Sequence, residues 1–144
     1  MKKTILVLLA FCLAVFAFAE ENAYRHGIAL NLGGPSSIAH LEYQYQVIAK
    51  EKHQLGISVG AGYIFGGVAF PIGVQYRFGK THQLETGLYY TQLASSVTTA
   101  FNLSLRLGYR LNLNRIFLHA YYAPMIGVSY SPEPWVGLGI GIYL

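Results

Sequence analysis

Apolar and polar residues alternate along most of the chain after residue 20. The most regular stretch covers residues 101–111, in which every second residue is apolar: Phe101, Leu103, Leu105, Leu107, Tyr109 and Leu111. The residues between them are polar, charged or glycine. Successive side chains of a β-strand point to opposite faces, so this pattern predicts a strand with one apolar face.

The alternation recurs along the chain and predicts an all-β protein of eight strands. The strands are expected at about residues 24–32, 39–47, 55–65, 68–78, 83–90, 101–111, 116–126 and 136–144. Glycines mark some of the connections, as at Gly66 and Gly67, where a tight turn is expected. The predicted fold is an eight-stranded antiparallel up-and-down β-barrel.

The distribution of charge distinguishes a membrane barrel from a soluble one. The charged residues inside the predicted strands all lie on the polar face: Glu42, Arg77, Glu85, Arg106 and Arg110. A lipid-facing arginine or lysine costs about 2–4 kcal/mol near the bilayer midplane, so a charge-free apolar face suits contact with hydrocarbon. The glycine-rich polar face fits a narrow interior. The alternative fold is a soluble periplasmic barrel with its apolar face inside.

Aromatic residues of the apolar face form two predicted belts. One belt contains Tyr43, Tyr45, Tyr76, Phe78 and Tyr109, and the other Tyr63, Phe65, Phe70, Tyr90, Phe101 and Tyr122. Such girdles flank the apolar band of outer-membrane barrels. With an even number of strands, both termini of the chain are expected on the periplasmic side, with short turns there at 49–52, 79–81 and 112–115.

The first residues predict export. Lys2 and Lys3 precede an apolar run at 4–16, and Ala17-Phe18-Ala19 follows as a small-x-small cleavage site. We therefore expect a signal peptide at 1–19 and the barrel at 20–144. Cys12 suggests a lipoprotein alternative, but Phe11 occupies a position where a small residue is required.

Composition excludes several classes of function. The net charge is +4, and Lys2 and Lys3 contribute half of it, so no basic patch favours nucleic-acid binding. The chain has no aspartate, and its only cysteine is Cys12. We expect no cofactor and no metal site, since His40 and His119 face the lumen from strands that are not neighbours.

The polar face supplies the candidate site, a lumen network of Glu42, Arg77, Glu85, Arg106, Arg110, His40 and His119. Gln44, Gln75, Tyr89 and Tyr121 are expected beside it. Eight strands leave an interior just wide enough for side chains, so these groups should pair and close the lumen. A gated narrow channel is the alternative.

A lipid-modifying enzyme is a further alternative, and it would need a serine and a histidine together at the outer rim. On the apolar face the histidines are His26 and His82, near the expected periplasmic end and without an obvious serine and acid beside them. Interfacial anchoring explains them better, and His53 lies at a turn. No catalytic residue is predicted.

Several short motifs resemble a known family. They are Gly33-Gly34-Pro35-Ser36, Gly79-Lys80 with Leu84-Glu85 and Gly87, Gly108-Tyr109-Arg110, Pro124, and Pro134-Trp135 with Gly137. Together they resemble the small eight-stranded outer-membrane β-barrel proteins, and most of all a group of short ones. The resemblance implies a place in the cell outer membrane of a Gram-negative bacterium, with lipid and the barrel-assembly machinery as partners. It implies no activity, so we expect a structural or surface-interaction role without catalysis and name no protein partner.

Overall fold

The computed structural model describes residues 24–34, 37–64, 66–95, 99–127 and 134–144. The predicted signal peptide at 1–19 and Cys12 lie outside these residues. Among the described residues, no helix is long and apolar enough to cross a membrane.

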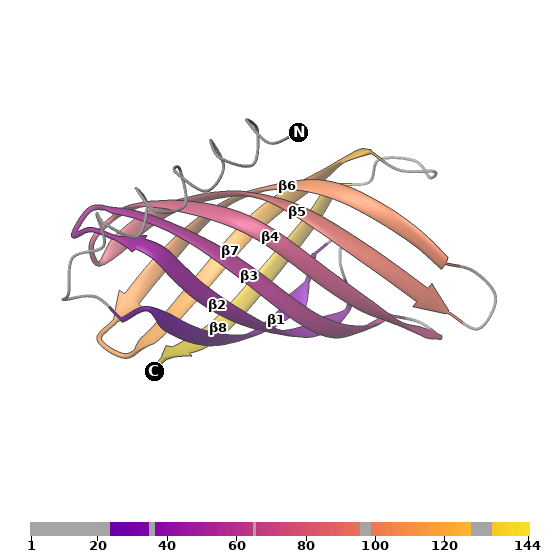
Figure 1. Ribbon diagram of the computed structural model, residues 1–144, viewed down its shortest axis with the longest axis horizontal. Helices are drawn as coiled ribbons and strands as arrows, with labels where there is room; N and C mark the ends of the chain where they lie inside the picture. Colours follow the sequence, from indigo (N-terminus) through magenta and orange to yellow (C-terminus); the bar gives the residue numbers. More distant parts are fainter. Residues whose placement is uncertain (1–23, 35–36, 65, 96–98, 128–133) are drawn as a thin grey trace, which may run out of the picture.

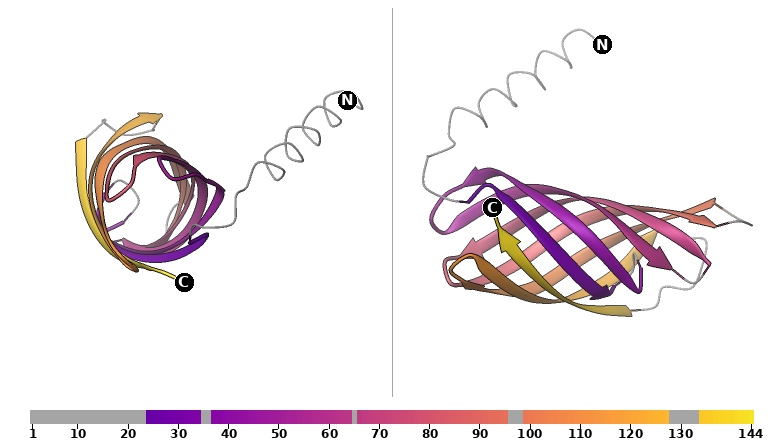
Figure 2. Two further views of the ribbon diagram at one scale, coloured as in Figure 1. Left: turned by 90° about the vertical axis from the view of Figure 1, so that its left-hand side faces the viewer. Right: turned by 90° about the horizontal axis from the view of Figure 1, so that it is seen from below.

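The described chain forms a closed barrel of eight antiparallel strands (Figures 1 and 2). The strands are β1 (His26–Gly33), β2 (Ala39–Ala49), β3 (His53–Ile64), β4 (Gly67–Gly79), β5 (His82–Ser95), β6 (Thr99–Leu113), β7 (Ile116–Gly127) and β8 (Pro134–Tyr143). Each strand pairs with the next along the chain, and β1 pairs with β8 to close the ring. The predicted all-β, eight-stranded barrel is confirmed.

The two ends of the barrel differ in their connections. At one end β1 begins and β8 ends, and residues 50–52, 80–81 and 114–115 join the other strands. We call this the short-turn end, and it lies at the left of Figure 1. At the opposite end, which we call the loop end, β1, β3, β5 and β7 end and β2, β4, β6 and β8 begin. Short turns are typical of the periplasmic side of bacterial barrels, so we expect the short-turn end to face the periplasm.

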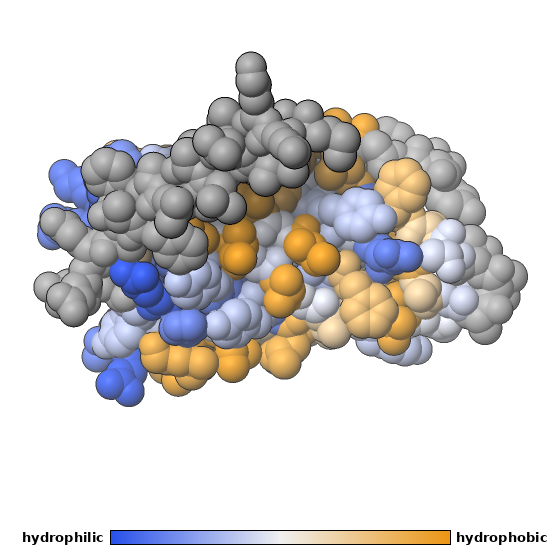
Figure 3. Space-filling model, in the orientation of Figure 1, coloured by the Kyte–Doolittle hydropathy of each residue, from blue (hydrophilic) through white to orange (hydrophobic). Residues whose placement is uncertain are grey.

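The polar face points inward, as the sequence predicts. On β4, Arg77 is 1% exposed, whereas its neighbours Tyr76 and Phe78 are 38% and 46% exposed. The same alternation runs along β5, where Glu85 is buried between the exposed Leu84 and Thr86. Apolar side chains cover much of the visible flank, and polar ones gather towards the short-turn end (Figure 3).

Strand ends differ from the prediction in detail. β5 continues to Ser95, because Gln92, Leu93 and Ala94 pair with β4 and β6. The strand is therefore longer than the one expected at 83–90. On β2 the pairing with β3 shifts register between Gln46 and Ile48, which marks a β-bulge.

Large side chains inside the barrel face glycines on the neighbouring strand. The register of β7 and β8 gives the pairs Phe117↔Gly141, His119↔Gly139 and Tyr121↔Gly137. A Cβ atom at any of these three glycines would collide with the β7 side chain opposite it. The glycines therefore provide the room into which the β7 side chains fit.

Both predicted aromatic belts lie on the outer surface, apart from Phe65, which is outside the described residues. At the short-turn end, three histidines each hydrogen-bond a belt tyrosine on the following strand: His26 with Tyr43, His53 with Tyr76, and His82 with Tyr109. We call these three pairs the His–Tyr clasps. They join strands β1 to β2, β3 to β4, and β5 to β6.

Candidate functional site

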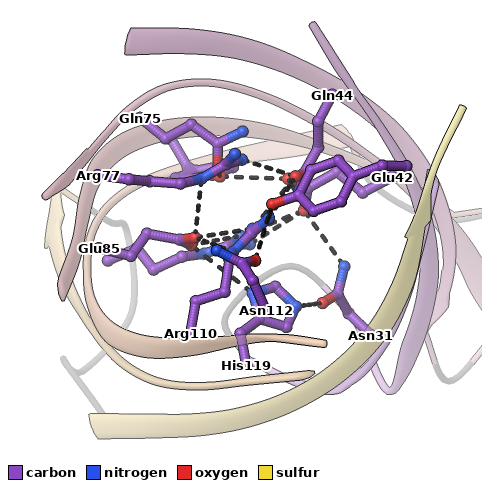
Figure 4. A network of polar contacts seen from close by, with 12 residues as sticks. Asn31, Glu42, Gln44, Gln75, Arg77, Glu85, Arg110, Asn112 and His119 are labelled. Carbon is purple, nitrogen blue, oxygen red and sulfur yellow. Dashed lines mark hydrogen bonds and ion pairs between the residues drawn. The ribbon is translucent and has the colours of Figure 1, made fainter. Parts of the chain in front are cut away.

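The predicted polar network occupies the barrel interior (Figure 4). Its charged members come from β2, β4, β5 and β6, on which they take inward positions of the alternating pattern. All seven predicted residues are buried: Glu42, Arg77, Glu85, Arg106, Arg110, His40 and His119. The network is centred on two carboxylates, those of Glu42 and Glu85.

Glu42 is the centre nearer the loop end, and its carboxylate accepts hydrogen bonds from five side chains. The donors are Asn31 Nδ2 at 3.3 Å, His40 Nε2 at 3.4 Å, Gln44 Nε2 at 3.0 Å, Tyr89 Oη at 3.2 Å and Arg106 Nη2 at 3.2 Å. Donors from β1, β2, β5 and β6 thus converge on one buried anion. A buried carboxylate is stable only when it is paired and hydrogen-bonded in this way.

Glu85 is the centre nearer the short-turn end, where two arginines hold it. Arg110 Nη2 lies 2.8 Å and Arg77 Nε 3.3 Å from Glu85 Oε2. Its other oxygen, Oε1, lies 3.8 Å from Arg106 Nη1 and 3.7 Å from His119 Nδ1. Arg106 therefore lies between the two carboxylates.

Gln44 joins the two centres. Its Nε2 donates to Glu42, and its Oε1 accepts from Arg77 Nη2 at 2.6 Å and from Arg110 Nη1 at 3.1 Å. The three arginines outnumber the two carboxylates, and this amide thus supplies them with a third acceptor group. With three arginines and two glutamates, the network carries one excess positive charge when its histidines are neutral.

Aromatic rings fill the space around the guanidinium groups. Arg106 lies between Tyr89 and Tyr121, with its Cζ 3.9 Å and 4.2 Å from the two ring centroids. Arg110 stacks on Phe117 at 4.0 Å. These distances place the cations on the ring faces, where the quadrupole attracts them. Charged groups and aromatic rings therefore pack against each other in this part of the lumen.

Asn31 of β1 is fully buried and joins the network, although it was not among the residues predicted from sequence. It donates to Glu42 through Nδ2, and its Oδ1 lies 2.6 Å from His119 Nε2. Asn31 thereby connects β2 to β7 across β1 and β8. The two lumen histidines, which come from strands that are not neighbours, belong to one network through it.

A serine, a histidine and a carboxylate align at the loop end of the lumen. Ser37 Oγ lies 3.0 Å from His40 Nδ1, and His40 Nε2 lies 3.4 Å from Glu42. Because the carboxylate accepts, the Nε2 atom of His40 carries a proton, and in the neutral ring Nδ1 then accepts from the Ser37 hydroxyl. All three side chains are buried and point away from the lipid face, with Ser37 only 6% exposed.

Among the described residues, the three remaining histidines lie away from the lumen network. His26, His53 and His82 are engaged in the His–Tyr clasps on the outer surface. Ser95 ends β5, while Ser96, Ser129 and Ser131 lie outside the described residues. Within the ranges that the structure describes, no three histidine, cysteine or acidic residues converge as ligands for a metal ion.

Comparison with known proteins identifies the family. A family model described as the outer membrane protein beta-barrel domain matches residues 4–142. The chain belongs to this family. The resemblance inferred from short motifs is thereby confirmed, and the family places the protein in the cell outer membrane.

A solved structure shares the fold of this outer-membrane barrel. It is the N-terminal β-barrel domain of OprF from Pseudomonas aeruginosa, with a TM-score of 0.56 and 15% sequence identity. The match covers 83% of this chain and 96% of the other. No curated protein matches the chain.

Proposed function

We propose that the protein is a non-catalytic, structural component of the outer membrane whose lumen is closed by its own side chains. The observation that carries this proposal is the pairing of both buried carboxylates with three arginines from β4 and β6. These contacts tie β2, β4, β5 and β6 together across the interior. Such a barrel is a rigid membrane element. A surface-interaction role would depend on the loop end, where several residues lie outside those described.

A narrow channel is the second candidate, and a specific observation favours it. Several buried polar atoms make no hydrogen bond within the described residues, among them Glu85 Oε1, Arg77 Nη1, Gln75 Nε2 and Ser104 Oγ. Buried polar atoms are usually satisfied by protein or water. An ion or water chain entering the lumen would find partners at these atoms.

Single-channel recording in planar bilayers separates the two candidates. We expect the wild-type protein to insert without a steady current, because Arg106 and its two stacked tyrosines fill the lumen. Arg106→Ala removes the central side chain and is expected to produce a measurable current, which also shows that insertion is detected. A steady current from the wild-type protein would favour the channel and contradict the closed structural role.

A lipid-modifying enzyme is the third candidate, and the Ser37–His40–Glu42 alignment is the feature that would support it. Acyl chains reach a barrel from its outer surface, whereas this serine is buried on the lumen side. We therefore expect no hydrolysis of phospholipid in detergent micelles by the wild-type protein. Hydrolysis that Ser37→Ala abolishes would assign catalysis to this serine and overturn the non-catalytic role.

A further inference from the structure

The outer surface at the short-turn end contains a groove of mixed character. It is lined by Ile48, Lys50, His53, Leu55 and Tyr76 and encloses about 490 Å³. Ile48 and Leu55 pair across β2 and β3 and form the apolar floor. Lys50 lies on the turn that follows β2, so the cationic part of the lining is at the rim of the barrel.

Two local features of the fold shape this groove. The β-bulge between Gln46 and Ile48 interrupts the pairing of β2 with β3, and bulges bend a strand and redirect its side chains. On the other side, His53 Nδ1 lies 2.6 Å from Tyr76 Oη, and the His53 ring packs on Phe78 with the centroids 5.0 Å apart. The clasp thereby holds the wall formed by β3 and β4.

The charges around the groove favour an anionic occupant. Lys50 and Lys52 lie on the turn, and both are exposed. The acidic residue between them, Glu51, forms an ion pair with Lys80 of the next turn. Its negative charge is thus balanced by a cation from outside the groove. The turns at this rim thus carry three lysines, Lys50, Lys52 and Lys80, and one glutamate, beside the apolar floor.

We propose that this groove binds a single anionic glycerophospholipid of the membrane leaflet at the short-turn end. The acyl chain would lie against Ile48 and Leu55, and the phosphate would lie next to Lys50 and Lys52. The groove is on the lipid-facing surface of a membrane barrel, so its occupant must be apolar along its body and negative at its head. Basic residues next to a membrane surface recognise anionic lipids in this way. This inference rests on the outer-membrane location and is independent of the proposed structural role.

Native mass spectrometry of the full protein, released from mild detergent, tests the proposal. The probes are phosphatidylglycerol and phosphatidylcholine with identical acyl chains, titrated separately. We expect the wild-type protein to retain one phosphatidylglycerol molecule at a lower lipid concentration than phosphatidylcholine. Equal retention of the two lipids would overturn the proposal.

Charge-removing variants locate the site. Each lysine near a membrane surface contributes roughly 1 kcal/mol to anionic-lipid binding, which corresponds to about fivefold in affinity. We expect Lys50→Gln to weaken phosphatidylglycerol binding about fivefold and the Lys50→Gln, Lys52→Gln double variant up to about thirtyfold. Arg115→Gln, on a different turn of the same end, is the matched control and should bind as the wild type does.

A groove-filling variant separates a defined site from adsorption to the basic turn. Ile48→Trp keeps both lysines but occupies the apolar floor, so we expect it to reduce retention of both lipids. Leu107→Trp, at an exposed position of the outer face of β6, is its control. Unchanged phosphatidylglycerol binding by Ile48→Trp, or by the double lysine variant, would overturn the site. A gel shift on boiling confirms that each variant is folded.

Discussion

At the residue scale, the interior is governed by volume as much as by charge. Tyr89 is fully enclosed because Gly73 and Gly87, on either side of its ring, have no side chains. Its hydroxyl can then donate to Glu42. The same relation holds for the β7 side chains and the glycines of β8. The glycines of the lumen therefore leave room for large side chains, and the polar contacts of those side chains depend on this room.

Substitution of Gly139 tests this relation. A Cβ atom at this position would collide with the side chains of His119 and Asn31, which hydrogen-bond each other. We expect Gly139→Ala to lower the free energy of unfolding by about 1–3 kcal/mol, the usual cost of overpacking a filled interior. The measurement is urea unfolding in detergent, followed by tryptophan fluorescence.

Gly27 on β1 provides the matched control for that substitution. It also faces the lumen, but a Cβ atom there would lie 3.5 Å from its nearest neighbours, an ordinary contact distance. Gly27→Ala should therefore leave stability nearly unchanged. Equal losses in the two variants would show that the effect comes from the strand backbone and not from the interior packing.

At the element scale, the observed strands match the predicted ones closely. Lipid contact requires an apolar residue and the interior favours a polar one, so the two kinds of residue alternate along each strand. The prediction fails where neighbouring inward and outward residues have the same polarity. Val47, Ile48 and Ala49 are all apolar, so the alternation gives no indication of the bulge that ends the regular pairing of β2. β5 was placed too short for a related reason: Thr91 and Gln92 are both polar, although one faces inward and the other outward.

The candidate site was predictable in its members but not in its connections. Inward positions of Glu42 and Glu85 follow from periodicity alone. Which arginine reaches which carboxylate depends on the register and stagger of eight strands, which the sequence does not display. The Ser37–His40 contact depends on the position of Ser37, which lies just before β2 and outside the alternating pattern. The His–Tyr clasps likewise require diagonal neighbours on two strands, as for His26, which pairs with Tyr45 but hydrogen-bonds Tyr43.

The turns at the short-turn end hold one another through an ion pair that can be titrated. Lys80 donates a hydrogen bond to Glu51 and lies beside it as a positive charge, and both effects lower the pKa of the Glu51 carboxyl below its usual value. The pair is intact above this lowered pKa and is lost as the pH falls through it. We expect an NMR titration of Glu51 to give a midpoint below that of a free glutamate.

The Lys80→Gln variant is the control for that titration. It removes the cation and its hydrogen bond while leaving the turn at 50–52 in place, so the midpoint should return towards the usual value. A midpoint that is normal in the wild-type protein, or low in both proteins, would contradict the ion pair between the two turns.

At the scale of the whole molecule, the barrel is inverted relative to a soluble protein. The charged side chains of its strands are buried inside, and apolar side chains cover much of its outer flank (Figure 3). This arrangement makes the position of a new charge decisive. Leu88, in the middle of β5, is 49% exposed on the lipid-facing side. We expect Leu88→Arg to lower stability in lipid vesicles by about 2–4 kcal/mol, as for arginine at a bilayer midplane.

Leu113 provides the comparison because it is equally exposed but lies at the end of β6, by the short turn at 114–115. Arginine there can reach the interface, and we expect a loss of at most about 1 kcal/mol. The measurement is reversible unfolding of both variants in vesicles. A larger loss of stability for Leu113→Arg than for Leu88→Arg would contradict this account, because it would show that the bilayer midplane lies nearer Leu113 than Leu88.

The structural role depends on the pairing of Glu42 and Glu85 with their arginines. Replacing both carboxylates by amides keeps the size of the side chains but leaves Arg77, Arg106 and Arg110 as buried, unpaired cations. Breaking one buried pair typically costs about 3–5 kcal/mol, because an uncompensated charge remains. The double variant should therefore lose most of the barrel's resistance to heat.

The most direct test is the temperature at which the folded band converts to the unfolded band on an SDS gel. Closed membrane barrels resist SDS until heated, since their backbone hydrogen bonds are paired around the ring. We expect the wild-type protein to shift only on strong heating and the Glu42→Gln, Glu85→Gln double variant to shift at a clearly lower temperature. The same conversion temperature for both proteins would show that the lumen network does not hold the barrel together.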